Sequence, residues 1–166
     1  PAPLTPEQTF DLYARVMLED DAAAARALND ALRPAFDGQD SLEFNKGAFA
    51  GALAAPLQGL LAAAGSDNAR IEAMPAVVAA NLGKTRCRAQ SSTLRDNDAV
   101  DGAKVATVDF TCQVTALDGL RPLFDASVAD NTPAGLKRFT DAYVAALSTG
   151  PRREVRGSVD LYPGKD

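Results

Sequence analysis

The two cysteines of the chain, Cys87 and Cys112, have a spacing that predicts a disulfide across a β-hairpin. Residues 85–94 and 103–116 alternate polar and apolar side chains, as half-buried antiparallel strands do. A polar loop, residues 96–102, separates these two segments. Facing cysteines would pair the strands and close the hairpin within that loop.

The cysteine pairing also predicts the register of the hairpin. With Cys87 opposite Cys112, the next pairs on that face are Ala89–Phe110, Ser91–Val108 and Thr93–Ala106. A disulfide indicates an oxidising compartment, such as the periplasm or the exterior of the cell. The alternative is a pair of buried free thiols. A redox-active pair is not expected, because the sequence lacks the Cys-x-x-Cys spacing.

The other face of the predicted hairpin carries arginines, amides and hydroxyls. Its residues are Arg86, Arg88, Gln90, Ser92, Thr107, Asp109, Thr111 and Gln113. A last strand, residues 154–162, would add Glu154, Arg156, Ser158, Asp160 and Tyr162. Arginine and tyrosine are enriched at the centres of protein interfaces. We therefore expect a surface that binds a partner, formed by Arg86, Arg88, Gln90, Asp109, Thr111, Gln113, Arg156 and Tyr162. The alternative is an ordinary solvated sheet face.

Histidine is absent, and this excludes several kinds of catalytic site. Nucleophiles activated by histidine and zinc sites built on imidazole cannot form. Carboxylate chemistry remains, and Glu19, Asp20 and Asp21 could form an acidic patch with Asp11 or Asp30. Helix capping explains Asp20 and Asp21 equally well. We therefore expect a protein that is not an enzyme, with no catalytic residues and no cofactor.

The polar loop has a partial likeness to a calcium-binding loop. Asp96 and Asp98 match its first and third positions, but Val100 stands at the fifth and Thr107 at the twelfth, where glutamate is needed. A solvated hairpin tip is the simpler interpretation, so no metal site is expected. The chain also lacks a phosphate-binding loop, a nucleophile elbow and a dinucleotide fingerprint.

The charge and the composition bear on partners and compartment. The net charge is −5, and residues 1–50 carry nine acidic and four basic residues, whereas residues 51–166 carry thirteen of each. This balance argues against a nucleic-acid partner. No apolar run reaches the length of a membrane span. The start Pro1-Ala2-Pro3 fits a mature end left by signal-peptide cleavage, or a trimmed end. The chain is rich in alanine and arginine, and together with this start the composition leads us to expect a periplasmic or secreted bacterial protein.

Helix signals surround the predicted hairpin. Thr5 and Gln8 form a capping box, and Asp20 or Asp21 could cap a second helix, so that the first segment is one long helix or two short ones. Further helices are predicted from Ser41, with a kink or break at Pro56, over residues 118–128, and from Thr132 to Gly150. Residues 69–82 fit a strand or a short helix.

These elements predict an α+β fold in a single domain, residues 1–166, with N-terminal helices packed on an antiparallel sheet of three to five strands and a further helix before the last strand. The expected function is binding of another protein, and the best candidate is an immunity or inhibitor protein that neutralises a partner toxin enzyme. One alternative is an NTF2-like protein or enzyme with a small-ligand pocket between sheet and helices, using Asp109, Arg88 or Tyr143. Another is a structural accessory of a bacterial envelope complex.

Overall fold

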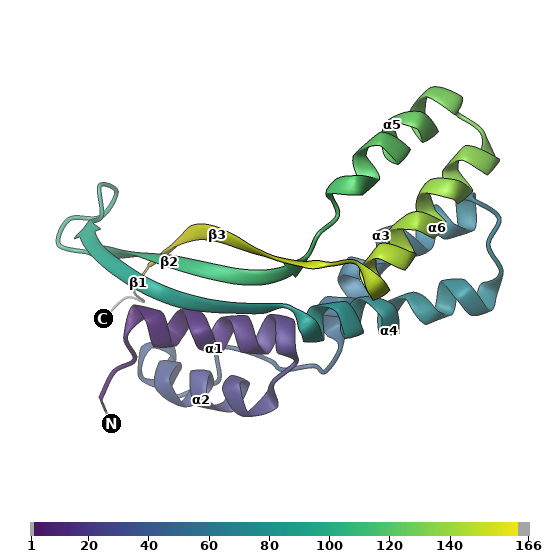
Figure 1. Ribbon diagram of the computed structural model, residues 1–166. Coiled ribbons are helices and arrows are strands. Elements are labelled where there is room, and N and C mark those ends of the chain that lie inside the picture. Colours follow the sequence, from purple (N-terminus) through teal and green to yellow (C-terminus); the bar gives the residue numbers. More distant parts are fainter. Residues whose placement is uncertain (1, 163–166) are drawn as a thin grey trace. The chain divides into compact units, whose positions relative to one another are not determined.

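The computed structural model describes residues 2–162 and has an α+β fold (Figure 1). Six α-helices accompany a three-stranded antiparallel sheet within these residues, and a helix precedes the last strand as predicted. The predicted processed end at Pro1 lies outside the described residues.

The elements follow one another in a helix-rich order. They are α1 (Pro6–Glu19), α2 (Ala22–Leu32), the 3-10 helix η1 (Arg33–Phe36), α3 (Ala48–Ala63), α4 (Asn68–Lys84), β1 (Arg86–Asp96), β2 (Lys104–Thr115), the 3-10 helix η2 (Asp118–Leu120), α5 (Arg121–Asp130), α6 (Pro133–Thr149) and β3 (Arg152–Leu161).

The chain divides into two compact units, which are described separately. The sheet unit contains the described residues up to Lys46, Arg86–Gln113 and those from Glu154 onward. The helical unit contains Gly47–Thr85 and Val114–Arg153. The expectation of a single domain stays a prediction.

Local capping signals explain how the first two helices begin and end. The Thr5 side chain accepts a hydrogen bond from the Gln8 backbone N–H, and the Gln8 side chain returns the bond, which confirms the capping box. Asp21 caps α2, while Asp20 adopts a left-handed conformation that ends α1. Two short helices therefore form, and they bury Val16 between them with the alanines of α2.

The structure corrects the helix start predicted at Ser41 and decides between the two alternatives for residues 69–82. Ser41 caps no helix, because α3 begins only at Ala48, and Pro56 lies inside α3 without dividing it. Residues 69–82 belong to α4, which also contains an internal proline and is capped by Asp67. Met74 and Val78 of α4, four residues apart, enter the core of the helical unit with Ala50, Ala54, Leu61 and Leu147.

The sheet has the order β1-β2-β3, and its hairpin register is confirmed at Cys87–Cys112 and at Ala89–Phe110. A β-bulge at Gln90 then shifts the pairing by one residue. The predicted pairs Ser91–Val108 and Thr93–Ala106 are therefore wrong. The observed pairs are Ser91–Asp109, Ser92–Val108, Thr93–Thr107 and Leu94–Ala106.

Helix α1 lies along the side of the sheet that carries Phe110 (Figure 1). Phe10 of α1 stacks on Phe110, with 4.8 Å between the ring centroids. Gly157 of β3 lies against the same ring, since a Cβ there would stand 2.6 Å from Phe110 Cζ. Glycine in this strand therefore makes room for an aromatic side chain of the neighbouring strand.

Candidate functional site

The candidate site is the side of the sheet that faces away from α1. A hollow of about 820 Å³ lies over this side. All three strands line it, with Gln90, Asp109, Phe110, Thr111, Glu154, Arg156, Gly157 and Ser158. We call the polar side chains of this hollow, together with Ser91, the open face. Four of the eight residues predicted to bind a partner, Gln90, Asp109, Thr111 and Arg156, lie together on it.

Asp109 stands at the centre of the open face and links the three strands. Its carboxylate accepts hydrogen bonds from Ser158 of β3 and from Ser91 of β1, the latter at 3.4 Å. Beside it, the Gln90 side-chain amide donates to the Thr111 hydroxyl at 3.2 Å. Neighbouring polar side chains therefore hold one another in place across the strands.

Gln113 of β2 lies beside the open face and contacts Glu154 of β3. The Gln113 amide donates to Glu154 Oε2 at 3.3 Å, and Arg156 Nε lies 3.7 Å from Glu154 Oε1. The Arg156 side chain is 84% exposed. Tyr162, which follows β3, is 65% exposed. Both of these predicted residues are therefore accessible to a partner.

A second group of polar contacts holds Asp160 on β3. Its carboxylate accepts hydrogen bonds from Thr107 at 2.7 Å and from Arg95 at 2.8 Å. These two bonds, the Thr107 bond first, lower the pKa of Asp160 below its ordinary value. The group is therefore negatively charged at neutral pH.

The two arginines of β1 predicted to bind a partner both contact α1. Arg88 binds Glu19 of α1 at 2.8 Å, and Arg86 Nε lies 3.4 Å from the same carboxylate. The hydrogen bond from Arg88 is the main cause that lowers the pKa of Glu19, and the same pair raises the pKa of Arg88. Both arginines therefore act within the sheet unit, between β1 and α1.

Ser92 is a further correction. The alternation of the sequence predicts Ser92 on the polar face, whereas its hydroxyl donates to Glu7 of α1 at 2.7 Å. The bulge at Gln90 is the physical reason, because one extra residue turns the rest of β1 over.

Replacing Glu19 with glutamine is expected to reduce stability at neutral pH by about 1 kcal/mol. Because the folded-state pKa of Glu19 lies below its ordinary value of 4.5, its contribution is complete above that pH and is lost as the pH falls through the folded pKa. Urea unfolding between about pH 7 and pH 3 should therefore show wild type losing more stability than Glu19→Gln. Glu72→Gln, at an exposed position of α4, is the control. Parallel pH profiles of wild type and Glu19→Gln would contradict the role of the ion pair.

The predicted disulfide between Cys87 and Cys112 is present, with 4.0 Å between the Cα atoms. Both cysteines are buried, at 7% and 6% exposure. The bond joins β1 to β2 three residues before the bulge. It therefore anchors the strand pair that supports the open face.

The other side of the sheet contains a feature that the sequence analysis missed. A hollow of about 450 Å³, here called the apolar groove, lies beside α1. It is lined by Phe10, Tyr13, Ala14, Met17, Leu18, Cys87, Phe110, Val159 and Leu161. Tyr13, Met17 and Val159 are between 36% and 46% exposed. The helical spacing of Tyr13 and Met17 and the alternation along β3 both indicate apolar faces, but such patterns do not tell a packed face from an open one.

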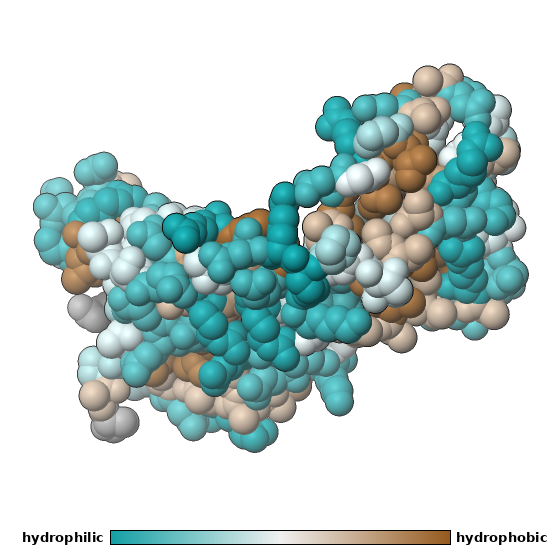
Figure 2. All heavy atoms as spheres, viewed as in Figure 1, coloured by the Kyte–Doolittle hydropathy of each residue, from teal (hydrophilic) through white to brown (hydrophobic). Residues whose placement is uncertain are grey.

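The helical unit has an apolar hollow of its own, of about 460 Å³ (Figure 2). Leu60 of α3, Phe124 and Val128 of α5, and Phe139 of α6 contribute to it. Phe139 also contacts Tyr143, with 5.9 Å between the ring centroids. Tyr143, named for the pocket alternative, thus belongs to the helical unit.

Two findings concern metals and membranes. Within residues 2–162, no group of three or more cysteine, aspartate or glutamate side chains is arranged to hold a metal ion. Asp96, in the loop that partly resembles a calcium site, binds Lys104. Among the helices of the described residues, none combines the length and the apolar character needed to cross a membrane.

Comparison of the chain with protein-family models, with curated proteins and with solved structures found no significant match. A functional proposal therefore rests on the chain's own residues and their geometry.

Proposed function

We propose that this is a non-enzymatic binding protein that acts by contact with another protein through the open face. The observation that carries the proposal is that all three strands present hydrogen-bonding side chains over one hollow surface. The best candidate is an immunity or inhibitor protein of a bacterial periplasm or a secreted fraction, which covers the active site of a partner toxin enzyme.

The contacts between open-face residues support this proposal. Asp109, Gln90 and Glu154 are each held by a neighbouring strand, so their side chains are ordered before a partner arrives. Ordering a flexible side chain on binding costs about 0.5–1.5 kcal/mol, and preorganised residues avoid much of this cost. Exposed Arg156 and Tyr162 add two of the residue types that are enriched among the dominant residues of protein interfaces.

The disulfide supports the proposed compartment. Such bonds persist in oxidising surroundings and are rare in the cytosol. The bond also pins β1 to β2, so the open face keeps its shape outside the cell. A rigid face of mixed charge suits stoichiometric blocking of an enzyme, which needs a complementary surface and no catalytic group.

The test uses a pair of variants on the open face. Tagged protein should capture one stoichiometric enzyme from the secreted and envelope fractions of the producing organism, and the pure protein should inhibit it. Gln90→Arg combined with Thr111→Arg should weaken binding by about tenfold or more. Gln39→Arg, at an exposed position of the sheet unit outside the open face, is the matched control. Unchanged affinity of the double variant would place the interface elsewhere.

A small-ligand function is the second candidate, and the apolar groove favours it. Its volume of about 450 Å³ lies in the range of ligand pockets, and its walls are almost entirely apolar. Native mass spectrometry of protein purified from its producer distinguishes the two candidates. A retained apolar ligand without a protein partner would favour the groove, and Met17→Glu should then abolish retention.

A further inference from the structure

The two outer strands of the sheet differ in how their edges are protected. On β1, the Ala89 backbone N–H donates to Asp11 of α1 at 2.8 Å. Gln90 then forms the bulge, and Ser92 binds Glu7 of α1. Bulges and covering helices are devices by which proteins prevent a sheet edge from pairing with another chain. The edge of β1 is therefore closed.

Among the described residues of the sheet unit, no helix or bulge of this kind covers the edge of β3. In the part of the chain that the structure describes, β3 pairs with β2 alone, and just before it Pro151 accepts a hydrogen bond from Ala116. The strand is ten residues long, whereas strands of five or six residues are the most common. A long edge with unpaired backbone groups is a template for a further strand.

The side chains of β3 are complementary to the same strand in one antiparallel register. When Ser158 lies opposite Ser158 of a second copy, Arg156 of each copy faces Asp160 of the other. On the side of the apolar groove, the resulting pairs are Val155–Leu161 and Gly157–Val159. Opposite charges and apolar neighbours that face each other across strands stabilise a sheet. Every charge and every apolar residue in this overlap thus finds a suitable counterpart.

Neighbouring registers are worse. With Gly157 opposite itself, Glu154 would face Asp160, and with Arg156 opposite itself, two guanidinium groups would meet. Like charges directly opposite each other destabilise a sheet. With Val155 opposite itself, Glu154 faces Arg156, but the apolar end of the strand stays outside the pairing. Among these four registers, the one centred on Ser158 satisfies both faces.

The groups that this register brings together are available. Arg156 is 84% exposed, and the Asp160 side chain is 36% exposed while Arg95 and Thr107 hold it in position. Val159 is 38% exposed, and a neighbouring strand would cover part of it. The arrangement is isologous, so it closes as a two-fold dimer and does not extend into a fibre.

We propose that a second copy of this chain occupies the edge of β3, so that two sheets join into one six-stranded sheet about a two-fold axis at Ser158. The apolar grooves of the two copies then lie on the same side of the joined sheet. The open faces lie on the other side and share Arg156 with the contact between the copies. Their remaining residues Gln90, Asp109 and Thr111 lie on β1 and β2, so the inference does not depend on the proposed function.

Molar mass in solution is the first test. Sedimentation equilibrium of the oxidised protein should give about 35 kDa, twice the chain mass of 17.3 kDa. Arg156→Glu and Asp160→Lys should each give the mass of one chain, because each places like charges opposite each other. An equimolar mixture of the two variants should return to about 35 kDa, since all the facing charges are then opposite. Gln90→Arg with Thr111→Arg should remain dimeric, because neither position lies on β3.

Cross-linking tests the register. Ser158→Cys should form an intermolecular disulfide on mild oxidation, because residues opposite each other in antiparallel strands have Cα atoms about 4.5–5.5 Å apart. Glu154→Cys is the control, since its two copies would lie roughly 26 Å apart along the strands. A single-chain mass for wild type up to about 1 mM would overturn the proposal. So would a dimer that persists in both charge variants and that Ser158→Cys fails to cross-link.

Discussion

Replacing both Cys87 and Cys112 with alanine is expected to lower the free energy of unfolding by about 3 kcal/mol. The two residues are 25 positions apart, and a bridge across a loop of this length restricts the unfolded chain considerably. Urea unfolding monitored by circular dichroism measures the difference. The loss should appear first in the sheet unit, because the bond joins β1, against which α1 packs, to β2.

The alanine variant also removes two buried sulfur atoms, so reduced wild type is the matched control. Reduction should increase the intact mass by about 2 Da, one hydrogen for each sulfur. Reduced wild type and the double variant should have similar stabilities, within about 1 kcal/mol. Equal stability of oxidised and reduced wild type would contradict a stabilising role for the bond.

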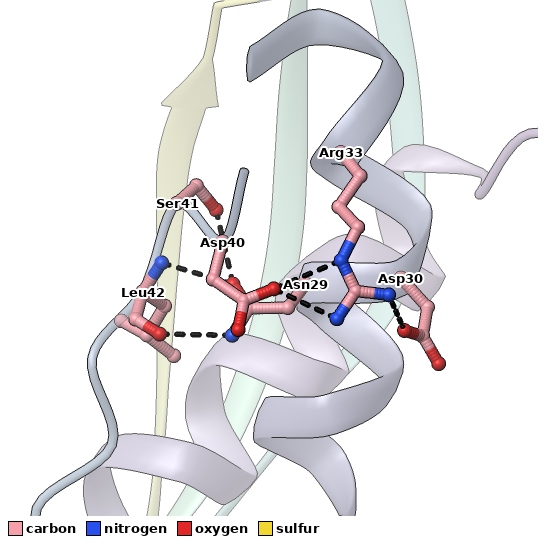
Figure 3. A network of polar contacts seen from close by, with 6 residues as sticks. All are labelled: Asn29, Asp30, Arg33, Asp40, Ser41 and Leu42. Carbon is pink, nitrogen blue, oxygen red and sulfur yellow. Dashed lines mark hydrogen bonds and ion pairs between the residues drawn. The ribbon is translucent and has the colours of Figure 1, made fainter. Parts of the chain in front are cut away.

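Replacing Asn29 with aspartate is expected to lower the free energy of unfolding by about 3 kcal/mol at pH 7. Asn29 is 7% exposed, and its amide Nδ2 donates to the Leu42 carbonyl at 2.8 Å (Figure 3). Its Oδ1 accepts from the Leu42 N–H at 2.9 Å and from the Ser41 hydroxyl at 3.3 Å. An ionised carboxylate cannot donate to the Leu42 carbonyl, and it would stand buried with one oxygen against another.

The pH dependence of this variant identifies the cause. A protonated carboxyl can donate where the amide did, so the folded state should raise the pKa of the introduced group. A raised folded-state pKa means that the variant loses stability as the pH increases. The difference in free energy of unfolding between wild type and Asn29→Asp should therefore become smaller as the pH is lowered from about 7 to about 4. Asn45→Asp, at an exposed position, is the control and should show little effect. A deficit that is the same at both pH values would exclude the lost donor as its cause.

Much of the fold follows from short-range patterns in the sequence. Thr5, Asp21 and Thr132 each cap the helix that follows, because a side-chain oxygen needs only the N–H groups two or three residues ahead. The change to an alternating pattern after Thr85 locates β1 and β2 to within two residues. These signals are contained within a few neighbouring residues and do not depend on the rest of the chain.

Other features have no short-range signal. Residues 69–82 suit either a strand or a helix, and packing of Met74 and Val78 in the helical core decides for the helix. The bulge at Gln90 could not be foreseen, because Ser91 and Ser92 are equally small and polar and fit either face. The residues next to Asn29 do not indicate its role, because its partners Leu42 and Ser41 lie thirteen and twelve positions further along the chain.

The sequence by itself determined the α+β class, the helix caps at Thr5 and Thr132, the partner of each cysteine and the first half of the hairpin register. These depend on local hydrogen bonds and on one repeating pattern. Only the tertiary structure decided which predicted residues share the open face. Arg88 is the clearest case, because its guanidinium donates a hydrogen bond to Glu19, which lies 69 positions away in the sequence. A side chain's partner depends on which distant segment packs beside it, and that information is spread over the whole fold.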